Sequence, residues 1–185
     1  MANYHYIIAS FPDLLLDFES RSLDRQAVVE EVKSQLSASD CELVDLLEFG
    51  LEGKNLSSHF YRLVGKSGCS FLKGYFSFDR EVREAKVAFL DGKPSESTSD
   101  NYGRFQAIFS ESNLIEREKR LDGMMWDKAE ELVLFEIFNI NTILSLLTRL
   151  SIASRWAALD QASGKKLFKQ LVDEVRGTFQ GIKQQ

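Results

Sequence analysis

The chain has 185 residues, with a hydrophobic fraction of 44% and a charged fraction of 28%, which are typical of one globular domain. Its formal net charge of −5 argues against duplex nucleic acid or an anionic lipid surface as the partner, because both attract basic proteins. No window approaches the ~18 apolar residues of a membrane span, and the N-terminus lacks the pattern of a secretory signal. We therefore expect a cytoplasmic protein without direct membrane insertion.

The first quarter of the chain predicts short helices. Residues 4–14 are aromatic and apolar around Pro12, and we expect a helix or an extended packing segment, since no second strand-like run could pair with a strand here. The spacing of apolar residues predicts a helix over 23–36. Ser39 and Glu42 have the spacing of a capping box, which predicts that the next helix begins at Ser39.

The middle of the chain alternates helical segments with polar ones. Residues 60–64 predict a helix that ends near 65–68. Residues 71–90 predict a longer helix, and its early part is too uniformly apolar for a single face, so we expect it to be buried. The small, polar stretch at 91–102 predicts a loop. The mixed charges of residues 111–120 are typical of a solvated helix face.

The last third of the chain carries the clearest helical pattern. Its apolar residues recur at alternating steps of three and four: Trp126, Ala129, Val133, Ile137, Ile140, Leu144 and Leu147. Asn is favoured at helix caps and mediocre inside helices, so we predict a break near 138–141. Asp160 is a good cap for a final helix, and that helix places these apolar residues on one packing face: Leu167, Phe168, Leu171, Val172 and Val175.

These patterns together predict an all-α fold. We expect one multi-helix packed domain over residues 1–177, with a polar loop at 91–102 and a frayed tail at 178–185. For the head of the domain, residues 4–14, the sequence allows either a short extended segment or a helix. Both cysteines are expected to pack as small apolar side chains.

A search for reactive groups finds no catalytic motif. The run Gly65-Lys66-Ser67 resembles the end of a phosphate-binding loop, but that motif needs a glycine where this chain has Phe60. The two histidines, His5 and His59, lack the spacing of metal ligands. We therefore predict no catalytic residue, no cofactor and no metal.

Five aromatic residues are candidate partner-binding residues. Trp126 and Trp156 lie on apolar helical stripes, and tryptophan is enriched among binding hot spots. The same large ring suits a core position if its N–H finds a hydrogen-bond acceptor, so both interpretations stay open. The other three candidates are Tyr4, Tyr6 and Phe11 in the aromatic head.

Four segments of the chain resemble a known family. They read YHYIIASFPDL at 4–14, FNINTIL at 138–144, RWAALD at 155–160 and GKKLF at 164–168. They resemble a bacterial family of unknown function that accompanies subunits of V/A-type rotary ATPases, and the C-terminal pattern is similar to the C (or d) subunit. That subunit is a helical, funnel-shaped adaptor between the membrane rotor ring and the central stalk. It is built from three similar modules, of which this shorter chain would supply one or two.

The resemblance implies a non-catalytic subunit or accessory protein of a V/A-type proton- or sodium-translocating ATPase. Its partners would be rotor or stalk subunits, and protein contacts would hold it at the periphery of the inner membrane. An adaptor that transmits torque needs stiff helices and matched contact surfaces, as the residue patterns predict. The alternatives are a helical interaction or regulatory module unrelated to the ATPase, and an enzyme whose site gathers around His59 and a carboxylate.

Overall fold

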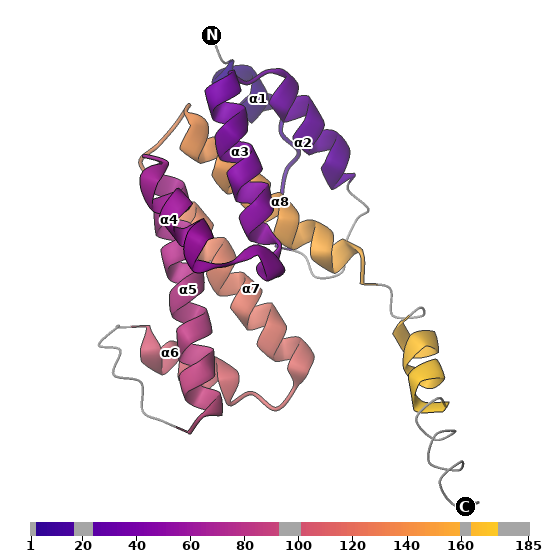
Figure 1. Cartoon of the computed structure of the whole chain (residues 1–185). Coiled ribbons are helices and arrows are strands. Elements are labelled where there is room, and N and C mark those ends of the chain that lie inside the picture. The colour runs from indigo at the N-terminus through magenta and orange to yellow at the C-terminus, as the bar shows by residue number, and fades with distance from the viewer. Residues whose placement is uncertain (1–2, 17–23, 93–100, 160–163, 174–185) are drawn as a thin grey trace, which may run out of the picture.

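The computed structural model of the chain describes residues 3–16, 24–92, 101–159 and 164–173. Within these ranges every regular element is a helix, which confirms the all-α prediction (Figure 1). The elements in chain order are α1 (Tyr4–Ser10), α2 (Arg25–Ser34), α3 (Ala38–Leu51), the 3₁₀ turn η1 (Gly53–Asn55), α4 (Ser58–Lys66), α5 (Ser70–Leu90), α6 (Tyr102–Phe109), α7 (Leu114–Glu131), α8 (Ile140–Ala157) and a last helix over 164–173.

Helix α8 is the centre of the fold, because α1, α2, α3, α5 and α7 all pack against it. Its apolar face is fully buried, through Ile143, Leu144, Leu147 and Leu150. Two polar side chains are buried with them, and each satisfies its hydroxyl with a backbone carbonyl. Ser145 donates to the carbonyl of Ala129 on α7 at 2.6 Å, and Thr148 donates within its own helix. The Ser145 bond therefore joins α8 directly to α7.

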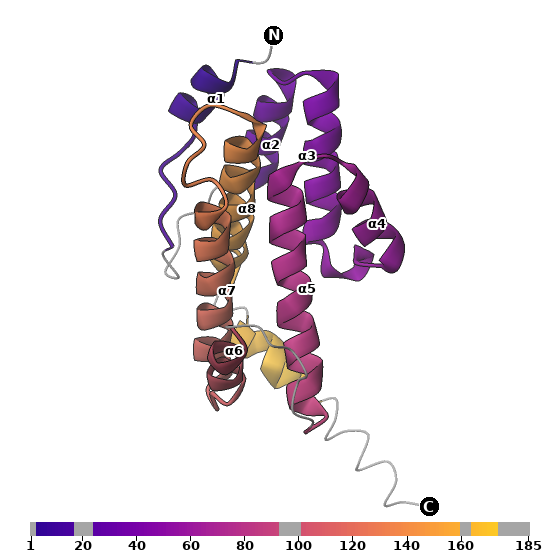
Figure 2. The same cartoon turned by 90° about the vertical axis from the view of Figure 1, so that its left-hand side faces the viewer.

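Helix α5 runs beside α7 along the length of the bundle (Figure 2). Its early part is buried as predicted, and it supplies Leu72 and four aromatic residues to the interior: Phe71, Tyr75, Phe76 and Phe78. Helix α6 covers the far end of α5, where Phe105 and Phe109 form a second cluster with Phe78 and Ala85. The sequence patterns did not predict α6, which lies at the opposite end of the bundle from α1.

The predicted cap at Ser39 is wrong by two residues. Ser37 caps α3 instead, since its hydroxyl oxygen accepts a hydrogen bond from the backbone N–H of Asp40 at 3.3 Å. The carboxylate of Asp40 in turn accepts from the hydroxyls of Ser37 and Tyr4, at 2.7 and 2.9 Å. The bond from Tyr4 to Asp40 joins α1 to the first turn of α3.

The predicted break in the last third is present but begins earlier. Asn139 caps α8, accepting from the backbone N–H of Thr142 at 3.1 Å, as its residue type predicts. Helix α7, however, already ends at Glu131. The apolar stripe therefore crosses eight non-helical residues, and Ile137, a member of that stripe, is exposed.

A helix follows α8 as predicted, but its apolar face does not pack. Leu167, Phe168 and Leu171 are all exposed, which corrects the expected core role of these residues. The proposed cap Asp160, most of the predicted loop at 91–102 and the tail at 178–185 lie outside the described residues.

Candidate interaction surface

Residues 132–139, between α7 and α8, form an apolar segment that we call the connection. Six of its eight residues are apolar, and four of these are exposed: Leu134, Phe135, Ile137 and Phe138. The side chain of Phe135 is 93% exposed, more than any other large apolar residue in the described ranges. Large apolar side chains that gather on a surface mark sites of interaction in soluble proteins. The connection is therefore the strongest candidate site.

The first end of the connection is fastened to the core. Leu132 and Val133 pack against the main hydrophobic cluster. Leu132 also lies over Gly74 of α5, where there is no room for a larger residue. Turn hydrogen bonds continue from the end of α7, including one from the N–H of Val133 to the carbonyl of Glu130 at 3.1 Å. The exposed residues therefore come directly after two residues, Leu132 and Val133, that are packed on the core.

The second end of the connection is held by a polar network. The carboxylate of Glu136 accepts hydrogen bonds from the side-chain amides of Asn139 and Asn141. The amide of Asn141 also contacts the hydroxyl of Ser70 at 3.0 Å, and its oxygen accepts from the thiol of Cys69 at 3.2 Å. Burial raises the pKa of the Cys69 thiol, which keeps it a neutral donor. Both ends being fixed, the exposed residues are presented in one arrangement.

Helix α1 lies beside the connection (Figure 2). The ring of His5 stacks on Phe138, with ring centroids 4.0 Å apart. Tyr6, one of the candidate partner residues, follows His5 on α1 and is exposed. Tyr4 and Phe11 are half-buried and pack against the main core. Of the three head candidates, Tyr6 alone has a largely exposed side chain.

The two tryptophans lie in the core. They are 5% and 8% exposed and form one cluster with Ile152. The indole N–H of Trp126 donates to Glu130 at 3.2 Å, and that of Trp156 donates to Asp122 at 2.6 Å. In this arrangement neither ring is presented to a partner. A direct partner contact by either tryptophan stays a prediction.

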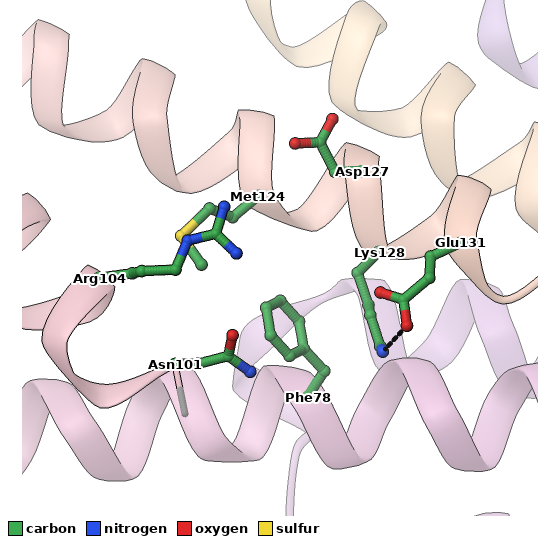
Figure 3. A pocket seen from close by; sticks show the side chains of 7 residues that line it. All are labelled: Phe78, Asn101, Arg104, Met124, Asp127, Lys128 and Glu131. Atoms are coloured by element: carbon green, nitrogen blue, oxygen red, sulfur yellow. Dashed lines mark hydrogen bonds and ion pairs between the residues drawn. The ribbon is translucent and has the colours of Figure 1, made fainter. Parts of the chain in front are cut away.

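Other features of the molecule offer less. Figure 3 shows a polar cavity of about 70 Å³ between α5, α6 and α7, which is far below the size of a usual ligand pocket. Its wall includes the Lys128–Glu131 ion pair at 2.9 Å. His59 is exposed on α4. No group of three or more His, Cys, Asp or Glu residues in the described ranges could hold a metal ion. Among these same residues, no helix is both long and apolar enough to cross a membrane.

Sequence reasoning missed the connection because of a coincidence of spacing. Val133 and Ile137 continue the helical step of the stripe although neither belongs to a helix. One signal was present: six apolar residues among seven, from Leu132 to Phe138, cannot all lie on one face of a helix. Such a run indicates either a fully buried segment or an exposed apolar one.

Comparison with known proteins gives one match. The model of a family described as "Protein of unknown function (DUF2764)" matches residues 97–178. No curated protein and no solved structure matches the chain. The matched part contains α6, α7, the connection, α8 and helix 164–173, while the aromatic head at 4–14 lies outside it. The candidate surface is thus largely contained in the part of the chain that resembles a family of unknown function.

Proposed function

We propose that this protein is a non-catalytic subunit or accessory protein of a V/A-type proton- or sodium-translocating ATPase, and that the connection is its contact with another subunit. The observation that carries the proposal is the exposure of four large apolar residues on a segment anchored at both ends. A partner that covered these side chains would gain apolar burial without first ordering the segment.

The shape of the bundle supports an adaptor role. Helices α5 and α7 have 21 and 18 residues, which correspond to lengths of about 31 and 27 Å. They lie side by side and are joined through α8, so a force applied at the connection acts on the whole packed core. The specific assignment to the ATPase comes from the sequence resemblance described above.

Co-purification tests both parts of the proposal. The protein is tagged in native cells and the associated ATPase subunits are identified by quantitative mass spectrometry. We expect rotor or stalk subunits with the wild type and their loss when Phe135→Ser is combined with Ile137→Ser. Removing two hot-spot side chains typically costs 2 kcal/mol or more, which is roughly a thirtyfold loss of affinity.

A matched control uses two other exposed apolar residues, away from the connection. Val87 and Leu90 lie at the far end of α5, and Val87→Ser with Leu90→Ser should leave the association intact. Absence of ATPase subunits from the wild-type complex would refute the ATPase assignment. A connection-dependent complex with other proteins would then favour a general interaction module, and equal effects of both double variants would refute the role of the connection.

A further inference from the structure

The helix over 164–173 carries an apolar face that no other described helix covers. It stands clear of the bundle in Figure 1. The side chains of Leu167, Phe168 and Leu171 are 51–70% exposed, and nine of the ten residues in the helix are exposed. An isolated helix of this length is marginal in water, because most helical stability in proteins comes from packing of the apolar face. We therefore expect a surface outside the described residues to cover the apolar face of this helix.

The helix separates apolar from basic residues around its circumference. At ~100° per residue, Leu167, Phe168 and Leu171 fall within an arc of ~100°. Around the helix axis, in the direction from Leu167 past Phe168, Lys165 lies ~60° beyond Phe168. Lys169 comes next after Lys165 in the same direction. The long apolar stems of such lysines let their ammonium groups reach outward from the edge of an apolar face.

The local charge of this helix is opposite to that of the whole chain. Its lysines, Lys165, Lys166 and Lys169, outnumber its one carboxylate, Asp173, so the segment carries 3 − 1 = +2 against a total of −5. All three lysines are exposed, and none forms an ion pair with a residue in the described ranges. The average charge, which by itself disfavours anionic lipid, conceals this basic segment.

We propose that helix 164–173 binds the surface of an anionic lipid membrane, lying flat with Leu167, Phe168 and Leu171 in the boundary between headgroups and acyl chains. The flanking lysines would then contact lipid phosphates. An amphipathic helix with lysines on its polar side and Leu and Phe on the other is the pattern of interfacial binding. One such surface satisfies both features at once and requires no matching groove. The inference does not rest on the proposed function.

A second copy of the chain is a less suitable occupant. The most exposed apolar surface it could offer is the connection, where the nearby carboxylates are already engaged. Glu131 pairs with Lys128, and Glu136 accepts from Asn139 and Asn141. Lysines of an incoming helix would have to compete with Lys128 for Glu131 and with two amides for Glu136. A lipid surface, in contrast, supplies anionic groups in excess.

Vesicle sedimentation of the full chain tests the proposal. The vesicles contain either an equal mixture of phosphatidylglycerol and phosphatidylcholine or phosphatidylcholine alone. We expect reversible binding to the anionic vesicles that weakens as salt rises, and little binding to the neutral ones. Lys165→Glu with Lys169→Glu should weaken binding by about tenfold or more, since each lysine near an anionic surface contributes to affinity.

The matched control reverses two exposed lysines on α5, with Lys73→Glu and Lys86→Glu, and changes the total charge by the same amount. This variant should bind as the wild type does. Phe168→Ser with Leu171→Ser should abolish binding, and circular dichroism checks that each variant keeps its helical content. Equal weakening by both lysine pairs would overturn the proposal, as would absence of binding at low salt. Light scattering adds a third test, because helix-dependent dimers without vesicle binding would assign the helix to a second copy instead.

Discussion

Leu132 lies so close to Gly74 that a Cβ on residue 74 would approach Leu132 Cδ2 to within 2.5 Å. Glycine in a helix interior normally costs stability, so its place in α5 reflects this contact. We predict that Gly74→Ala destabilises the protein by about 1–3 kcal/mol through overpacking, less the ~1 kcal/mol gained in helix propensity. Urea denaturation measures the change.

Two further variants separate the effect of the Gly74–Leu132 contact from the gain in helix propensity that alanine brings at any helical glycine. Gly65 lies in α4 with open space around it, so Gly65→Ala should be neutral or stabilising by up to about 1 kcal/mol. In the double variant Gly74→Ala with Leu132→Ala the added methyl group fills the space that Leu132 leaves. We expect the two costs to be smaller together than in sum. Additive costs would mean that the two side chains do not compete for the same space.

The cap of α8 is also an anchor of the connection, so its loss should have two effects. Asn139→Ala removes the bond to the N–H of Thr142 and one of the donors to Glu136. We expect a loss of about 0.5–2 kcal/mol in unfolding free energy, with faster amide hydrogen exchange at residues 134–138. Asn113→Ala is the matched control, since Asn113 caps α7 without contacting the connection. It should cost a similar amount and leave exchange in the connection unchanged.

The sequence predicted the helices of this fold better than it predicted which of their apolar residues are buried. The aromatic run of α5 and the apolar stripe of α8 predicted buried helices, because those faces do meet other helices. Ile137 and Leu167 have the same spacing and are exposed, since no described element lies over them. Spacing shows which residues share a face, whereas burial depends on the tertiary neighbour, which a single sequence does not reveal.

The candidate site illustrates the same limit. The head and the two tryptophans were selected by residue type, and the fold buries both indoles beside hydrogen-bond acceptors. Tyr6 is the one of the five candidates whose side chain is largely exposed. The apolar run at 132–138 has residues that continue the spacing of a helical stripe, and the fold exposes four residues of the run because α7 ends at Glu131.

The hydrogen bond from Tyr4 to Asp40 should hold α1 in place. The phenol donates to a carboxylate that is 9% exposed, and burial together with this bond raises the pKa of Tyr4. Tyr4→Phe removes the donor and keeps the ring, so we expect a loss of about 1–2 kcal/mol. Hydrogen exchange at Ile7, whose N–H bonds to the carbonyl of Asn3 within the first turn, should accelerate most. An unchanged rate at Ile7 would show that apolar packing alone retains α1.

Asp122 should make the stability of the protein depend on pH. Burial raises its pKa above the ordinary value of 3.8, although Arg155 and the indole N–H of Trp156 stabilise the carboxylate. The folded chain therefore holds this proton more tightly than the unfolded chain. As pH rises from below 3.8 through the folded-state pKa, the unfolded chain releases the proton first, and the contribution of Asp122 to stability falls. Above the folded-state pKa this contribution is constant.

Asp122→Asn isolates that contribution, because the amide does not titrate and its oxygen can still accept from Trp156. We expect the unfolding free energy of the wild type, relative to that of the variant, to decrease as pH is raised from about 3 to about 6. Urea titrations of both proteins at each pH give this difference, and pH effects common to the two proteins cancel in it. An increase of this difference over the same range would mean that the attraction of Arg155 outweighs the effect of burial. The charged form of Asp122 would then be more stable in the folded chain than in the unfolded chain.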